Sequence, residues 1–157
     1  MPKKKLIEYL DENKVKYVVI SHSPAFTAQE IAASAHIRGK ELAKTVVIKI
    51  DGKIAIAVLP ASYNIQFESL KAMLGAETVR LAYEQEFIAK FPDCEIGAMP
   101  PFGNLYNMDV FVAESLADTK EIAFNACSHD QLIKMDYSDF EKLVKPARLK
   151  FTYHTML

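Results

Sequence analysis

Residues 44–59 read KTVVIKIDGKIAIAVL and place Asp51-Gly52 between two runs rich in β-branched residues. An Asp-Gly pair in that position is the strongest short-range signal of a β-hairpin, because a type I′ turn needs positive φ at both of its central residues. We therefore predict two antiparallel strands, at residues 44–50 and 53–59, joined by this turn.

Further strands and helices are expected on both sides of the hairpin. Leu6, Ile7 and Leu10 recur at helical spacing and predict an amphipathic helix over residues 3–13. Apolar spacing, caps and turn residues predict other helices at 27–36, 65–74, 84–90 and 138–144, with Gly75 ending the second of these four and Ser138 capping the last. Short strands are expected at 17–20, 78–81, 108–112, 121–125 and 131–135, a long loop at 92–104 and a tail at 146–157.

Strands outnumber helices in the middle of the chain, and hairpins are expected there. This pattern favours an α/β (α+β) fold, with a mixed, mostly antiparallel sheet surrounded by helices, over a doubly wound fold. The 157 residues fit one domain of ordinary size and show no repeat or linker. We expect residues 1–157 to form a single domain.

The composition limits the class of protein. Half of the residues are hydrophobic, a quarter are charged and the net charge is −1, which is typical of a globular domain and shows no overall basic signature for nucleic acid. No apolar run is long enough to span a membrane and no secretion signal is present, so we expect a soluble, cytoplasmic protein. Cys94 and Cys127 form no CxxC pattern, and no disulfide framework is expected, which agrees with a reducing compartment.

Several kinds of chemistry have no support in the sequence. The four histidines and two cysteines lack the spacing of metal ligands, so no metal site is expected. Neither a P-loop nor a dinucleotide-binding fingerprint is present, so nucleotide hydrolysis and hydride transfer are not expected and no cofactor is predicted. A Cys–His hydrolase is unconvincing because Cys127 lies only two residues before His129.

Lys44 is the first candidate functional residue. Period-2 alternation places Lys44 on the same strand face as Val46, Ile48 and Ile50, and that face should point toward the core. A lysine there could hold a carboxyl, carbonyl or phosphate oxygen at the rim of a pocket. It could equally be a strand-end lysine that extends to water, and the residues alone leave both interpretations open.

The segment Gly97–Gly103, GAMPPFG, is the second candidate. Its two prolines fix the backbone and its glycines permit positive φ or close approach, so it could present N–H groups to an oxyanion. It could also be a structural turn with Phe102 in the core. His22 and His129 are further candidates for a ligand contact or proton transfer, although a lone histidine is more often an ordinary surface or packed residue.

These segments together resemble the YbaK/prolyl-tRNA-editing family. Residues 22–32, HSPAFTAQEIA, are similar to its His…Thr-x-x-Glu segment, and Lys44–Val47 to its lysine strand. Gly97–Gly103 resembles its Gly-x-x-x-Pro-Phe-Gly loop, and residues 124–129, FNACSH, resemble the Asn-Ala-Gly-Ser/Thr-His segment of the prolyl-tRNA-editing branch. Order and spacing match over residues 15–145.

The resemblance implies a YbaK-like fold with a pocket between the lysine strand and the glycine–proline loop. It also implies hydrolysis of the ester between a wrong amino acid, often alanine or cysteine, and the 3′ end of tRNA for proline. The implied partners are the tRNA acceptor end and, as a candidate, an aminoacyl-tRNA synthetase, but neither a membrane nor DNA. Lys44 would anchor the terminal adenosine region or the ester oxygens, the N–H groups of Gly97 and Ala98 would stabilise the oxyanion, and water or the ribose 2′-hydroxyl would be the nucleophile.

The same resemblance implies a set of substrate-binding residues and shows two departures. The implied set consists of His22, Thr27, Thr45, Met99, Pro100, Pro101, Phe102, Gly103, Ser128 and His129. Cys127 stands where the family segment has glycine, and Ala98 where some members have a second glycine. Two other interpretations stay open: a non-catalytic module that binds tRNA or a synthetase, and a hydrolase of another acyl ester.

Overall fold

The computed structural model describes residues 4–22, 30, 37 and 39–154. Its α-helices are α1 (Lys4–Glu12), α3 (Phe67–Leu74), α4 (Glu84–Phe87), α5 (Glu114–Ala117) and α6 (Tyr137–Val144), and its 3-10 helices are Gly39–Glu41, Ile88–Lys90 and Gly103–Tyr106. Its strands are β1 (Tyr17–Ser21), β2 (Ala43–Ile50), β3 (Lys53–Pro60), β4 (Tyr63–Ile65), β5 (Val79–Leu81), β6 (Val110–Ala113), β7 (Glu121–Asn125), β8 (Gln131–Asp136), β9 (Ala147–Leu149) and β10 (Thr152–His154). None of the helices in these residues is long and apolar enough to cross a membrane.

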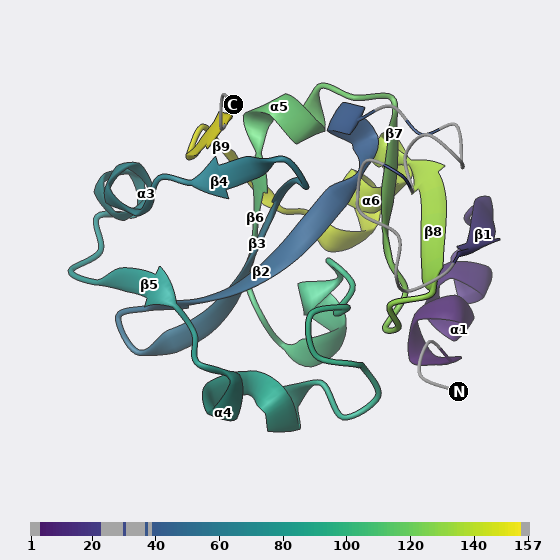
Figure 1. The fold of residues 1–157 in the computed structure, drawn as a ribbon, viewed down its shortest axis with the longest axis horizontal. Coiled ribbons are helices and arrows are strands. Elements are labelled where there is room, and N and C mark those ends of the chain that lie inside the picture. The colour runs from purple at the N-terminus through teal and green to yellow at the C-terminus, as the bar shows by residue number, and fades with distance from the viewer. Residues whose placement is uncertain (1–3, 23–29, 31–36, 38, 155–157) are drawn as a thin grey trace.

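The β2–β3 hairpin forms the centre of a five-stranded sheet with the order β5-β2-β3-β6-β9 (Figure 1). Ile50 pairs with Lys53, and the two turn residues Asp51 and Gly52 have φ values of 48° and 86°. The turn therefore has the positive φ at both positions that the Asp-Gly pair predicts. Pairing is antiparallel among β5, β2 and β3 and parallel from β3 to β6 and β9, which confirms the predicted mixed sheet.

A second sheet, with the order β1-β8-β7, is antiparallel throughout and lies on the right in Figure 1. It meets the first sheet at an isolated parallel bridge between Leu42 and Ala123. A two-stranded sheet of β4 and β10 joins the middle of the chain to its C-terminal part.

The hydrophobic core fills the space between the two larger sheets and is rich in aromatic side chains. Phe102 is fully buried, and its ring lies 5.5–5.6 Å from the rings of Phe124 and Phe140. Tyr9 of α1 packs edge-on against the same ring, with centroids 6.2 Å apart. The core thus ties the N-terminal helix and the C-terminal helix to the loop that contains Phe102.

Most predicted elements are confirmed, with shifts of a few residues at their ends, but three expectations need correction. The tail at 146–157 is not a tail, because β9 and β10 lie within it and pair with β6 and β4. Ser138 does not cap α6, since the N-cap residue is Asp136. Ile65 belongs to β4 and not to the helix that follows. The helix predicted at 27–36 lies outside the described residues except for Glu30, which is helical.

Candidate functional site

Lys44 lines a hollow of about 390 Å³ that we call the Lys44 pocket. The other lining residues are Val46, Asn64, Ile65, Phe67, Leu81 and Tyr153. They come from β2, β4, α3, β5 and β10, so parts of the chain more than a hundred residues apart build one wall. Lys44 and Val46 face the same side of β2, as the alternation predicts.

The electrostatic setting of Lys44 differs from that of the next lysine on its strand. Burial lowers the pKa of the Lys44 ammonium, because partial removal from water disfavours the charged form. Within the part of the chain that the structure describes, Lys44 has no hydrogen bond or ion pair of its side chain. Lys49, by contrast, lies 2.6 Å from a carboxylate oxygen of Glu86. Lys44 is therefore a half-buried cation that a negative ligand could neutralise.

None of the other six lining residues of the Lys44 pocket was among the predicted site residues. Asn64, Phe67 and Tyr153 are the three that offer an amide or an aromatic ring to a ligand. Asn64 pairs with Tyr153 across β4 and β10, and Tyr153 is 47% exposed. An exposed aromatic ring beside a cation is a surface on which a nucleic-acid base can stack. The only sequence signal was alternation of apolar and polar residues after Pro146, and it is too short to identify a strand partner.

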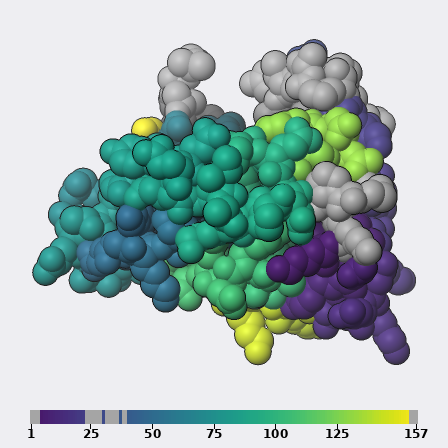
Figure 2. Space-filling model, turned by 90° about the horizontal axis from the view of Figure 1, so that it is seen from below, coloured from purple at the N-terminus to yellow at the C-terminus, as the bar shows by residue number. Residues whose placement is uncertain are grey.

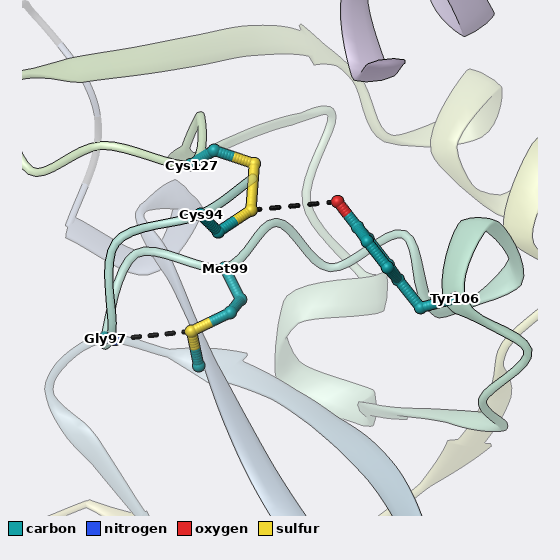
Figure 3. Close-up of a disulfide and its surroundings, with 5 residues drawn as sticks. All are labelled: Cys94, Gly97, Met99, Tyr106 and Cys127. Atoms are coloured by element: carbon teal, nitrogen blue, oxygen red, sulfur yellow. Dashed lines mark hydrogen bonds between the residues drawn. A yellow bond between two sulfur atoms is a disulfide. The ribbon is translucent and has the colours of Figure 1, made fainter. Parts of the chain in front are cut away.

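The glycine–proline loop uses its own N–H groups internally. The Ala98 N–H donates to the carbonyl of Glu95 at 3.0 Å, and the Gly97 N–H points at the sulfur of Met99 at 3.3 Å (Figure 3). The oxyanion role of Ala98 stays a prediction, and it would require the Ala98 N–H to exchange its bond to the Glu95 carbonyl for the oxyanion. Gly97, with φ of 87°, has only a weak thioether acceptor.

The rest of this loop is interior. Its buried residues are Ala98, Met99, Pro100, Pro101, Phe102 and Gly103. A Cβ added to Gly103 would lie 2.6 Å from Val110 Cγ2 and 2.8 Å from the Met108 carbonyl oxygen, so only glycine fits there. The expected contact of Phe102 with a substrate is not supported, because its ring is fully buried among other aromatic rings.

His22, Ser128 and His129 come together at the turn that follows β7. The His22 N–H donates to the Asp130 carbonyl at 2.8 Å, and the Ser128 hydroxyl donates to the Asp130 carboxylate at 2.9 Å. His129 is exposed, and its Nε2 lies 2.7 Å from the Ile96 carbonyl oxygen. The turn thus contacts the start of the glycine–proline loop. Thr27 lies outside the described residues.

Cys94 and Cys127 form a disulfide, which corrects the expectation that none would be present (Figure 3). The Tyr106 hydroxyl lies 3.7 Å from Cys94 Sγ and can donate to it. Cys127 has φ of 67°, in the left-handed region that favours glycine. The glycine that the resemblance implies here would adopt this conformation without penalty, whereas a cysteine needs a compensating interaction.

The Lys44 pocket and the glycine–proline loop lie on opposite faces of the β2–β3 hairpin. Val47 pairs with Ile56, so the two side chains lie on the same face of the hairpin. A Cβ added to Gly103 would lie 3.4 Å from Ile56 Cδ1, so the face that carries Val47 packs against the loop. Lys44 precedes Val47 by three residues and points to the other face, whereas Thr45 shares the face of Val47. None of the described residues of the loop lines the Lys44 pocket, so the single shared pocket implied by the resemblance is not seen among them.

The two features nevertheless belong to neighbouring strands. Leu42, which immediately precedes β2, bridges Ala123 of β7 in parallel orientation. Lys44 lies two residues after Leu42, and His129 lies six residues after Ala123. A ligand seated at the start of β2 is therefore close to the strand that leads into this turn.

A larger hollow, of about 610 Å³, is lined by residues of the β2–β3 hairpin, of α4 and of the segment that follows the glycine–proline loop. Figure 2 views the molecule from below, where α4 lies in Figure 1. Its central charges satisfy one another: Glu86 accepts from Arg80 at 2.8 Å and from Lys49 at 2.6 Å. These contacts, that of Arg80 first, hold the pKa of the Glu86 carboxyl far below its usual range. We regard the Lys44 pocket as the better candidate site, because its cation is unpaired among the described residues. No group of three potential metal ligands occurs in those residues.

The chain matches the model of a protein family described as "Aminoacyl-tRNA editing domain" over residues 22–143. It is 25% identical over 100 residues to a proline–tRNA ligase of Bacillus mycoides (strain KBAB4), a match that covers 64% of this chain and 17% of the ligase. A proline–tRNA ligase of Bacillus cytotoxicus is 26% identical over 89 residues, which cover 57% of this chain and 16% of the ligase. The chain thus spans about a sixth of the length of these curated relatives.

Two solved structures share the fold over nearly the whole chain. Hypothetical protein APE2540 has a TM-score of 0.83 at 19% identity and covers 96% of this chain and 100% of its own. A proposed trans-editing enzyme for prolyl tRNA synthetase has a TM-score of 0.82 at 15% identity and covers 97% of both chains. At these identities the likeness establishes the architecture.

Proposed function

The chain belongs to the family of aminoacyl-tRNA editing domains, and we propose that it is a trans-editing deacylase. In this proposal it hydrolyses the ester bond between a mischarged small amino acid, alanine or cysteine, and the 3′ end of tRNA for proline. Such editing is needed because a synthetase pocket cannot reject a similar or smaller side chain by more than about 1–3 kcal/mol per methylene. The reaction occurs where tRNA is charged, so we place the protein in the cytoplasm.

The half-buried Lys44 ammonium is the observation that carries this proposal. It lies in a hollow with aromatic and amide neighbours and has no anionic partner among the described residues. An aminoacyl-tRNA end brings the matching groups: a phosphate, an ester and an aromatic base. A cation held in a partly desolvated position acts more strongly on such groups than an exposed lysine does.

The proposed mechanism needs no covalent enzyme intermediate. Lys44 holds a phosphate or ester oxygen and stabilises the negative charge that develops as the carbonyl carbon is attacked. Water attacks either directly or after the ribose 2′-hydroxyl has moved the acyl group from O3′ to O2′, and only the attack by water releases the amino acid. The alcohol of the terminal ribose is the leaving group. Tyr153 and Phe67 offer aromatic faces to the terminal base. Of the loop amides proposed as oxyanion donors, Gly97 keeps this role in the arrangement in which Lys44 holds the phosphate and the ester passes the start of β2 to the loop, because the loop lies on the opposite face of the hairpin from the Lys44 pocket. The Gly97 N–H would then exchange the Met99 sulfur for the oxyanion.

Release of amino acid from alanyl-, cysteinyl- and seryl-tRNA for proline tests the proposal. Wild type is compared with Lys44→Ala and with Lys53→Ala, which removes a lysine of the same hairpin that is 70% exposed and outside the Lys44 pocket. We expect hydrolysis of at least one substrate, its loss in Lys44→Ala and its retention in Lys53→Ala. Equal activity of the two variants would refute the assignment to Lys44.

The second candidate is a non-catalytic module that binds the tRNA acceptor end or a synthetase. The glycine–proline loop favours it in one respect, because most of that loop is interior and the Ala98 N–H is already bonded. Under this alternative no aminoacyl-tRNA in the panel is hydrolysed, yet tRNA binding is retained and weakens steeply with added salt.

A further inference from the structure

We propose that the Cys94–Cys127 disulfide is a redox-controlled crosslink that fixes the glycine–proline loop against the turn carrying His129. Cys94 lies three residues before Gly97, and Cys127 lies two residues before His129. The bond therefore joins two segments that the topology brings together from 33 residues apart. The effect on catalysis rests on the proposed editing function, whereas the effect on the loop does not.

The noncovalent contacts beside the disulfide show what the crosslink holds. The Glu95 N–H donates to the Cys127 carbonyl at 2.9 Å, and the Cys127 N–H donates to the Ala98 carbonyl at 3.0 Å. A Cβ on Gly97 would lie 3.2 Å from His129 Cε1, so the imidazole rests directly on the loop backbone. Separation of these segments would change the surroundings of both Gly97 and His129.

The positive φ of Cys127 has a conformational cost that the disulfide can offset. A side chain at φ of 67° costs free energy that glycine avoids. The side chain is almost fully buried and makes the bond to Cys94, which is a contact that no glycine could make. The crosslink thus depends on a cysteine at the position where the resemblance implies glycine.

A disulfide in a reducing compartment is usually transient, so the bond is expected to respond to the thiol pool. Cys94 is half-buried and is the sulfur that a small thiolate can reach. Attack on Cys94 Sγ releases the Cys127 thiolate and leaves a mixed disulfide, and a second small thiol then frees Cys94. Two small thiols become one small disulfide and the protein gains two thiols; oxidation by a small disulfide such as oxidised glutathione is the reverse.

The test uses the wild-type protein equilibrated with oxidised or reduced glutathione, with Cys94→Ser as the control that cannot form the bond. Alkylation and mass measurement give the thiol state. Amide hydrogen exchange then follows the N–H groups of Glu95, Ala98 and Cys127. We expect exchange at these sites to be about tenfold faster after reduction, since the loop opens more easily. Cys94→Ser should exchange at the fast rate in both buffers.

The catalytic readout is kcat and KM for whichever aminoacyl-tRNA is hydrolysed. We expect kcat to fall about tenfold on reduction with KM nearly unchanged, because loop geometry and not tRNA contact is lost. Equal exchange rates in the two buffers, or cysteines that stay reduced in oxidised glutathione, would overturn the crosslink. Redox-dependent exchange with an unchanged kcat would overturn its effect on catalysis. Redox-dependent exchange without hydrolysis of any substrate would support the crosslink and count against the editing function.

Discussion

Removal of the disulfide should lower the free energy of unfolding by an amount that its loop length determines. The two cysteines are 33 residues apart, and the loss of chain entropy in the unfolded state for a loop of that length is worth about 3 to 4 kcal/mol at 25 °C. Cys94→Ser and Cys127→Ala should therefore both be less stable than the oxidised wild type by about that much. Cys127→Gly should lose about 1 kcal/mol less than Cys127→Ala, because glycine adopts positive φ without the Cβ penalty.

Urea unfolding followed by far-ultraviolet circular dichroism is the appropriate assay, since the chain contains no tryptophan. The samples are kept free of reductant, and a second series contains dithiothreitol. In that series the wild type should unfold at the same midpoint as Cys94→Ser. A Cys94→Ser variant as stable as the wild type without reductant would refute the stabilising crosslink. A Cys127→Ala variant as stable as Cys127→Gly would refute the argument from backbone strain.

Three further predictions concern the site, the loop and the charges near α4. Burial lowers the pKa of Lys44, so the Lys44 ammonium should lose its proton at a lower pH than an exposed lysine does. The difference in deacylation rate between wild type and Lys44→Ala should therefore decline as pH rises through that lowered pKa. A rate difference that does not change with pH would contradict this. Gly103→Ala should destabilise the protein by about 1–3 kcal/mol through the clash with Val110, with Val110→Ala relieving part of the cost in a double-mutant urea experiment. The Glu86 pKa is depressed, chiefly by Arg80, so the carboxylate contributes stability that is present above the unfolded pKa and is lost as pH falls through the folded one. Glu86→Gln should accordingly lower the urea midpoint at pH 7 but have little effect in strong acid, and a pH-independent loss would show that the charge is not responsible.

The parts of the fold that were predictable are those specified by local sequence. Asp51-Gly52 fixed the central hairpin and its register, because a two-residue turn leaves one pairing for the flanking strands. Gly75 ends α3 in the left-handed conformation, as a helix-terminal glycine should. Both signals act over a few residues, and neither depends on what lies across the fold.

The parts that were not predictable depend on partners distant in the chain. β9 and β10 have three residues each, and they are strands only because β6 and β4 offer them an edge. Ser138 was a reasonable helix cap by residue type, but the helix begins earlier, after Asp136. Propensity alone could not reveal the two short strands, because tertiary pairing decides them. It could not place the start of α6 either, because Asp and Ser are both favourable cap residues.

The candidate site also combines features that local sequence predicts with features that depend on residues distant in the chain. Period-2 alternation placed Lys44 correctly beside Val46 on one face of β2. Tyr153 could not be recognised, because its place in the pocket follows from the pairing of Tyr153 with Asn64, 89 residues earlier in the chain. The disulfide was hidden for a related reason: two cysteines without a spacing motif give no sign that the fold brings them together.

The pairing of β10 with β4 also determines when the Lys44 pocket can be complete during synthesis. A ribosome synthesises β2, β4 and α3 long before Tyr153, so most of the Lys44 pocket can be in place on the nascent chain while one wall is still missing. That wall forms only after residue 154 has left the exit tunnel. The pocket around Lys44 is therefore complete only once β10 has been synthesised and has paired with β4.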